Sequence, residues 1–181
     1  MVRPKIVITG TGAVTPLGLS ATSFWDSLIT GQSGIGPMTL CDPTNFPCQI
    51  AGEVSGFDPV QYMDVKEARR MARFSQLAVA AAAQAIEQAE LKVRPSEAYD
   101  VGVLLGNGNG GFPTIEEGCR TLIERGGMKM SPFFFPMILP NMASSNVGRI
   151  FGFKGYSSTV ITACAASNQA IGEAMETLRR G

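Results

Sequence analysis

The chain has 181 residues, of which 45% are hydrophobic, and its 15 basic residues balance its 15 acidic ones. This length and apolar content predict one globular domain with a single core. The balanced charge argues against nucleic acid or a membrane surface as a partner, because the protein has no net charge to attract either. Histidine is absent from the sequence, which excludes imidazole acid–base chemistry and histidine metal ligation within this chain.

The amino-terminal third predicts one strand, one helix and a long irregular segment. Residues 5–9 form a β-branched apolar run that stops at glycines, as a buried strand does before a tight loop. A helix is expected to follow, capped by Ser20 or Thr22. Residues 31–60 are rich in Gly, Pro, Asp and Asn, so we expect a surface excursion with a short strand near residues 49–51.

The middle of the chain predicts a long buried helix and a second strand. Residues 66–90 carry a helical pattern whose centre has almost no large polar residue, which is typical of a helix covered on all sides. Residues 99–105 form an apolar run without alternation, which favours a parallel strand covered on both faces. The glycine-rich run 106–111 ends this strand, and a helix is expected over residues 114–125.

The remaining residues predict an aromatic loop, two helices and a third strand. The loop covers residues 131–136, the helices residues 140–151 and 165–180, and the strand residues 157–162. Strands that alternate with helices indicate an α/β domain with a mainly parallel sheet and helices on both sides. Because no strand follows the last helix, we expect the sheet to be incomplete.

The cysteines and the apolar runs suggest the compartment. The start of the chain lacks the extended apolar region of a signal peptide, and no apolar run reaches membrane-spanning length. We therefore expect a cytoplasmic protein. Free thiols are expected rather than disulfides or a zinc site, because the four cysteines are scattered without CxxC spacing, at Cys41, Cys48, Cys119 and Cys164.

Cys164 lies where a β-branched strand is predicted to turn into a helix rich in alanine and glycine. The unpaired N–H groups and the dipole at a helix amino terminus favour a thiolate, which is the nucleophilic form of cysteine. The alternative is a small cysteine buried in a core turn. The residues of this segment alone favour that alternative.

The run Gly106-Asn-Gly-Asn-Gly-Gly111 matches GxGxxG between a strand and a helix, which is also the pattern of dinucleotide-binding proteins. In those proteins an acidic residue about 20 positions later ends a second strand. Here that region is the aromatic segment 131–136, with neither strand nor acid. A tight turn that needs glycine conformations is the simpler interpretation.

Two further groups of side chains could bind ligands. Lys66, Arg69, Arg70 and Arg73 follow helical spacing and could receive an acidic partner, although a solvated helix face is more common for such a run. The apolar segment around Phe134 could line an acyl pocket or simply fill the core, which is the more common role.

Taken together, the segments resemble the β-ketoacyl-[acyl-carrier-protein] synthases, particularly the elongating type II enzymes of bacteria and plastids. The match is colinear and covers essentially the whole chain. It runs through Val7-Ile-Thr-Gly-Thr-Gly-Ala-Val-Thr-Pro-Leu-Gly18, Gly31-Gln-Ser-Gly-Ile35, Gly106-Asn-Gly-Asn-Gly-Gly111, Ser131-Pro-Phe-Phe134, Pro140-Asn-Met142 and Thr162-Ala-Cys-Ala-Ala-Ser167.

The resemblance implies a thiolase-like fold in which residues 1–181 form an incomplete amino-terminal half. In this family an acyl group moves from carrier protein to a cysteine, and here Cys164 matches that position. Malonyl-carrier protein is then decarboxylated and its carbanion attacks the acyl thioester, a stage served by two histidines and a lysine of the second half. We therefore expect the condensation machinery to be missing from this chain, and the alternatives are a polyketide-type ketosynthase or a non-catalytic partner resembling a chain-length factor.

The resemblance also suggests binding residues and partners. Phe134 matches an acyl-pocket aromatic, and Asn109 stands where the family often has an apolar residue. The expected partners are acyl-carrier protein, acyl and malonyl thioesters, and either a second copy in a homodimer or a complementing carboxy-terminal half. No cofactor or metal is expected, and a plant protein of this kind would lie in the plastid stroma. The positions that resemble the carrier-protein patch are Lys66, Arg69, Arg70 and Lys129.

Overall fold

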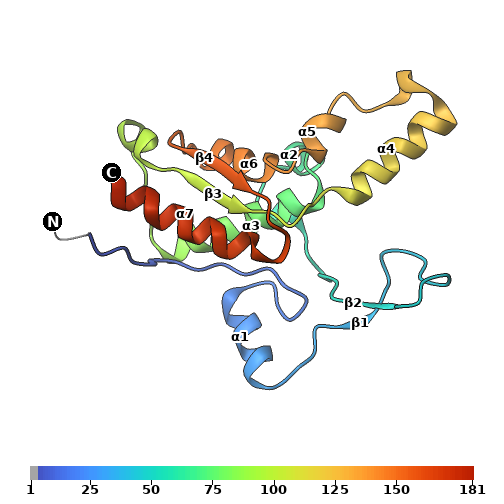
Figure 1. The fold of residues 1–181 in the computed structure, drawn as a ribbon, viewed down its shortest axis with the longest axis horizontal. Coiled ribbons are helices and arrows are strands. Elements are labelled where there is room, and N and C mark those ends of the chain that lie inside the picture. Colours follow the sequence, from blue (N-terminus) through green and yellow to red (C-terminus); the bar gives the residue numbers. More distant parts are fainter. Residues whose placement is uncertain (1–3) are drawn as a thin grey trace.

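A computed structural model describes residues 4–181 (Figure 1). Its centre is a parallel pair of strands, β3 (Val103–Gly106) and β4 (Ser157–Val160). Successive side chains of a strand point to opposite faces. Val103 packs on the core beside α6 (Met142–Phe151), whereas Leu104 faces α7 (Ala166–Arg180). Helices therefore cover both faces of the strand pair, which confirms the predicted α/β class.

The core lies between the strands and two packed helices, α3 (Arg73–Gln88) and α6. Val79 of α3 is fully buried, and every residue from Phe74 to Ile86 is at least partly covered. The prediction of a helix covered on all sides is confirmed only in part, because Ser75, Val79 and Ala80 are the residues of α3 that are buried. The buried apolar cluster consists of Met63, Ala68, Met71, Val79 and Val147.

The single helix predicted over residues 66–90 is wrong at its start. The structure has a short α2 (Val65–Ala68) and then an extended residue, Ala72, before α3 begins. This break buries Met71 and Ala72 to 3% exposure each. The Gln76 side-chain amide donates to the carbonyls of Ala68 and Met71 at 2.8 and 3.4 Å, so the interrupted backbone keeps hydrogen-bond partners. Lys66 and Arg73 therefore do not share one helix face.

The strand predicted over residues 5–9 does not form. Within residues 4–181 this segment has no neighbouring strand, and Val7 and Ile8 are 61% and 80% exposed. It continues along α3 instead, where a Cβ at Gly10 would lie 2.1 Å from the Ala85 carbonyl oxygen. A β-branched run becomes a strand only where another backbone pairs with it, and here its neighbour is a helix.

The other elements surround this centre. The long irregular segment contains a two-residue antiparallel ladder, which confirms the short strand expected near residues 49–51. The aromatic loop is partly helical, and the predicted strand over residues 99–105 is shorter because residues 95–100 form 3₁₀ turns. These elements are α1 (Ala21–Ile29), β1 (Gly36–Pro37), β2 (Ile50–Ala51), α4 (Phe112–Arg125) and α5 (Phe134–Ile138), with 3₁₀ turns at Pro59–Gln61, Pro95–Asp100, Gly127–Lys129 and Ala163–Ala165.

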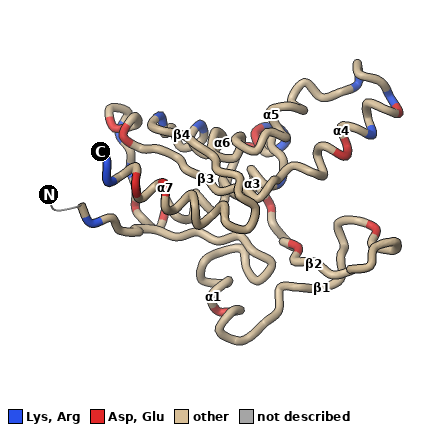
Figure 2. Tube along the Cα trace, in the orientation of Figure 1, with Lys and Arg blue, Asp and Glu red and all other residues tan. Residues whose placement is uncertain are grey.

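Charges are spread over the molecule, with basic positions around α2 and at the far end of α4 (Figure 2). None of the helices in residues 4–181 is long and apolar enough to cross a membrane. Over the same residues, no group of three or more cysteine and acidic side chains lies together as a metal site would require.

Candidate active site

Cys164 lies in the turn between β4 and α7. Two residues follow Val160, one 3₁₀ turn spans Ala163–Ala165, and α7 begins at Ala166. The turn holds Ala163 at φ +48°, a left-handed conformation that costs a non-glycine residue roughly 1–2 kcal/mol. Cys164 is exposed, so the alternative of a cysteine buried in a core turn is wrong.

Backbone N–H groups gather near Cys164 at the start of α7, where those of Ala165 and Ala166 donate to the carbonyls of Thr162 and Ala163. α7 has 15 residues, and among the described residues no side chain caps its first turn and no acidic residue lies in it. The first N–H groups of a helix have no partner within the helix, and the helix dipole adds partial positive charge at this end. The arrangement therefore favours an anionic group of a bound ligand close to Cys164.

The glycine-rich loop that follows β3 packs directly against this turn. A Cβ at Gly106 would lie 2.3 Å from the carbonyl carbon of Ala166, and a Cβ at Gly108 would lie 3.9 Å from the Ala163 oxygen. On the other side, a Cβ at Gly110 would lie 2.4 Å from Cγ of Phe74. At Gly106 and Gly110, therefore, only glycine allows this close approach between the loop, α7 and α3.

Asn107 organises this loop from inside. Its side-chain oxygen accepts from the backbone N–H groups of Asn109 and Gly110, both at 3.0 Å, and its side-chain amide donates to the Pro140 carbonyl at 3.1 Å. Three amides of the loop, those of Asn107, Asn109 and Gly110, are thus already bonded. This occupancy argues against the dinucleotide-binding interpretation of GxGxxG.

Asn109 is exposed and has φ +108°, which asparagine tolerates better than most residues. It lies in the same loop as Gly108, whose position faces Ala163. The structure therefore brings the Asn109 loop beside the Cys164 turn. Two non-glycine residues with positive φ, Ala163 and Asn109, follow the carboxyl ends of two adjacent parallel strands.

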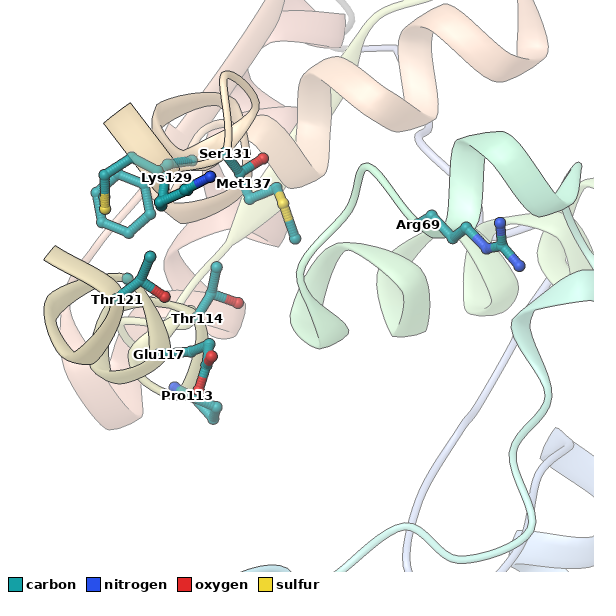
Figure 3. Close-up of a pocket in the computed structure, with 11 residues that line it drawn as sticks. Arg69, Pro113, Thr114, Glu117, Thr121, Lys129, Ser131 and Met137 are labelled. Carbon is teal, nitrogen blue, oxygen red and sulfur yellow. The ribbon is translucent and has the colours of Figure 1, made fainter. Parts of the chain in front are cut away.

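Phe134 lies at the start of α5 and packs against α4. Its ring covers Gly118, where a Cβ would lie 2.1 Å from Cε2 of Phe134. Beside this contact is a cavity of about 460 Å³ between α4 and the segment that leads into α5 (Figure 3). Its lining is mostly apolar and includes Phe134, Met130, Met137, Pro113, Thr114 and Thr121.

The predicted basic residues do not form one continuous row. Arg69 and Lys129 both line the 460 Å³ cavity, but Figure 3 shows Arg69 apart from the other side chains with its guanidinium pointing away. Arg70 lies over the ring of Phe133 at 4.6 Å, and Lys66 is exposed on α2. All four residues are exposed, but Lys66, Arg69 and Arg70 lie in or just after α2, whereas Lys129 lies in the 3₁₀ turn that follows α4.

Arg73, the last member of the predicted helical stripe, has a structural role. Its guanidinium lies 4.5 Å from the ring centre of Phe57 and donates to the carbonyls of Phe57 and Val54, at 3.5 and 3.3 Å. These contacts hold the irregular segment against α3.

Two residues of the site were missed from the sequence, Asn107 and Gly118. An asparagine directly after a strand and before glycine often hydrogen-bonds the backbone two residues later, so Asn107 could have been found from its position. Gly118 carried no such signal, because its significance depends on the ring of Phe134, 16 positions away, lying over it.

Comparison with known proteins gives consistent matches. The sequence model of the family "Beta-ketoacyl synthase, N-terminal domain" matches residues 3–181. A curated relative from Synechocystis, 3-oxoacyl-[acyl-carrier-protein] synthase 2, is 41% identical over 179 residues, which are 99% of this chain and 43% of that protein. The protein of the same name from Staphylococcus aureus is 38% identical over 98% of this chain and 43% of its own length. The chain thus spans less than half the length of these relatives.

Solved structures agree with the sequence matches. The ishigamide ketosynthase/chain length factor superposes with a TM-score of 0.86 at 28% identity, covering 99% of this chain and 45% of that chain. A type II PKS acyl-carrier protein in complex with its ketosynthase bound to the hexaketide (AntDE:AntF) gives a TM-score of 0.84 at 27% identity, covering 99% and 49%. A β-ketoacyl synthase from Burkholderia phymatum gives 0.80 at 28% identity, covering 97% and 43%.

Proposed function

Because the chain belongs to the β-ketoacyl synthase family, whose amino-terminal domain it matches over residues 3–181, we propose that Cys164 accepts an acyl group from a carrier-protein thioester. The fold is the thiolase-like fold of the ketosynthases. The observation that carries the proposal is the position of Cys164, exposed in a strained turn directly before a helix without a side-chain cap.

The proposed transfer needs a thiolate and backbone N–H donors. The turn supplies the thiol and part of the donor set. The Cys164 thiol loses its proton to solvent, and the thiolate forms a bond to the carbonyl carbon of the acyl thioester. The negative oxygen of the tetrahedral intermediate would be stabilised by backbone N–H groups, of which the Cys164 N–H is one. The bond between that carbon and the carrier's sulfur then breaks, and the leaving thiolate takes a proton from solvent.

In the complete enzyme we propose that the acyl group on Cys164 is then extended by two carbons. Malonyl-carrier protein loses carbon dioxide, the resulting enolate carbon attacks the acyl carbonyl, and the bond to Cys164 breaks to return the thiolate. Stabilising the enolate requires hydrogen-bond donors. This chain contains no histidine, so we propose that these donors come from a complementing carboxy-terminal half.

Fatty-acid elongation is proposed over polyketide assembly. The relatives at 38–41% identity are named 3-oxoacyl-[acyl-carrier-protein] synthase 2, whereas the polyketide structures are 27–28% identical. A non-catalytic partner role is disfavoured, because partners resembling chain-length factors usually lack the cysteine that this chain retains.

We propose acyl-carrier protein and a second copy of the chain as partners. One related ketosynthase is described in complex with its acyl-carrier protein, and here the exposed Lys66, Arg69, Arg70 and Lys129 could attract an acidic surface. The face around α7 exposes Ile161 and Ile171 at 52% and 63%, and we propose that a second copy or a complementing carboxy-terminal half covers this face. The cytoplasm, or the plastid stroma in a plant, suits this role.

The test is acylation of the purified protein by an acyl-carrier protein thioester, read by intact mass and peptide mapping. All four cysteines are exposed, so exposure alone does not select Cys164. We expect one acyl group, located on Cys164 and lost in Cys164→Ala but retained in the matched control Cys119→Ala. Acylation spread equally over the four thiols, or retained in Cys164→Ala, would overturn the proposal.

A further inference from the structure

Asn107 is a buried polar side chain whose oxygen and amide are both hydrogen-bonded. It is 7% exposed, and its oxygen accepts two backbone N–H bonds while its amide donates to the Pro140 carbonyl. The two donors fix which side-chain atom is the oxygen, since an amide nitrogen could not accept them. Burial of such a group is tolerable only with these partners, so its geometry is strongly constrained.

The contacts of Asn107 join three segments that are distant in sequence. Its oxygen holds the loop that carries Asn109, and its amide holds the turn that follows α5, the helix that begins with Phe134. Its backbone N–H donates to the Val160 carbonyl at 2.9 Å, at the end of the strand that leads to Cys164. One residue thus links the strand that leads to the acceptor turn, the Asn109 loop and the turn after α5, and it reaches Phe134 only through α5.

The side chain of Asn107 does not hold the Cys164 turn itself. That turn is closed by its own backbone, with Ala165 N–H donating to the Thr162 carbonyl at 3.0 Å. A change confined to the Asn107 side chain should therefore move the Asn109 loop and the α5 turn relative to each other while leaving the thiol where it is.

We propose that Asn107 is a positioning residue that determines which acyl chain lengths Cys164 accepts, an inference that rests on the acyl-transfer function proposed above. Its oxygen fixes the conformation of the Asn109 loop, because it accepts from two backbone N–H groups of that loop. Its amide fixes the distance from this loop to the turn after α5. Because Asn109 and Phe134 are the residues that the family resemblance assigns to the acyl chain, a change in their separation should change the length of chain that is accepted.

The experiment compares Asn107→Asp with Asn107→Ser in the protein expressed from its complete gene. Aspartate keeps both acceptor bonds but cannot donate to Pro140, whereas serine is too short to reach all three partners. Asn146→Asp is the matched control, because Asn146 is also buried, at 5% exposure, but belongs to α6 and bonds Arg149. The substrates are pantetheine thioesters of short, medium and long saturated acyl chains, and iodoacetamide measures thiol reactivity separately.

We expect Asn107→Asp to change the ratio of long-chain to short-chain acylation rates by roughly three- to tenfold, the effect of one lost buried hydrogen bond. The alkylation rate of Cys164 should stay within about twofold, because the bonds of its turn are intact. Asn146→Asp should leave the ratio unchanged. If the aspartate variant does not fold, the serine variant and its chain-length ratio decide the question.

An unchanged ratio of long-chain to short-chain acylation rates in a folded Asn107 variant overturns the inference. An equal loss of rate for all chain lengths and for iodoacetamide also overturns it, because that result would show a merely structural role. Both results leave the proposed acyl transfer standing, since the wild-type protein would still acylate Cys164. Failure of the wild-type protein to acylate Cys164 overturns the proposed function, and this inference with it.

Discussion

Replacing Gly118 by alanine tests whether the ring of Phe134 lies over α4 as the structure shows. The added Cβ would lie 2.1 Å from Cε2 and 2.7 Å from Cδ2 of Phe134. Carbon atoms in normal contact are 3.5–4.0 Å apart, so the ring must retreat by roughly 1.5 Å. The ring is the free end of a side chain beside a cavity of about 460 Å³, so it has room to turn into that space.

Two opposing terms set the expected stability of Gly118→Ala. Alanine stabilises a helix interior by about 1 kcal/mol relative to glycine, whereas overpacking a filled site costs about 1–3 kcal/mol. We therefore expect a net destabilisation of about 0–2 kcal/mol. The matched control is Gly172→Ala in α7, where no described heavy atom lies within 4 Å of the added Cβ, and this variant should gain about 1 kcal/mol.

The assays are urea unfolding of both variants and acylation of Cys164 with short and long acyl thioesters. Gly118→Ala should be less stable than Gly172→Ala by about 1–3 kcal/mol. Slower acylation by long chains would show that the acyl chain reaches the cavity into which Phe134 turns. Equal stabilisation of the two variants with unchanged chain-length preference would show that Phe134 does not rest on Gly118 in solution.

Three further predictions concern docking, turnover and acid stability. Arg69→Glu should weaken carrier-protein binding by roughly three- to tenfold in low salt and less in high salt, because salt screens the attraction of an exposed charge. The control Arg180→Glu, at the end of α7, should leave binding unchanged, and titration calorimetry at two salt concentrations measures both. The 181-residue chain alone should release no β-ketoacyl product from acyl- and malonyl-carrier protein, because it has no histidine to stabilise the enolate; a two-carbon-longer product in the mass spectrum, abolished by removing the acceptor thiol, would contradict the prediction. The pKa of Glu53 lies below its usual value because the hydroxyl of Thr39 and neighbouring N–H groups donate to the carboxylate. The contribution of this carboxylate to stability is therefore fully present above the usual glutamate pKa and is lost as pH falls through the lowered value, and Glu53→Gln should remove this part of the acid unfolding curve.

The local pattern was sufficient to predict the turn that carries Cys164. A β-branched run followed by small residues allows few structures other than a strand leading into a helix, and β4 and α7 form there. The parallel pairing of β3 with β4 was likewise expected from two apolar runs separated by helices. In these segments the local preference and the tertiary packing agree.

The segments that were predicted wrongly depend on distant neighbours. The run at residues 5–9 has strand-forming residues but lies along α3 rather than beside a strand. The break before α3 follows from burial of Met71 and Ala72 and from the hydrogen bonds of Gln76, none of which a helical pattern reveals. The row of basic residues failed for the same reason, because helical spacing has no meaning across an extended residue.

The candidate site shows how an exposed cysteine is held without being buried. The loop beside it approaches α7 and α3 at Gly106 and Gly110 more closely than any side chain would allow, so these contacts are made by backbone and are stiff. A single amide, that of Asn107, then satisfies the polar groups that this approach encloses. Cys164 is therefore exposed in this chain while its position is set by the packed backbone behind it and by the left-handed conformation of Ala163.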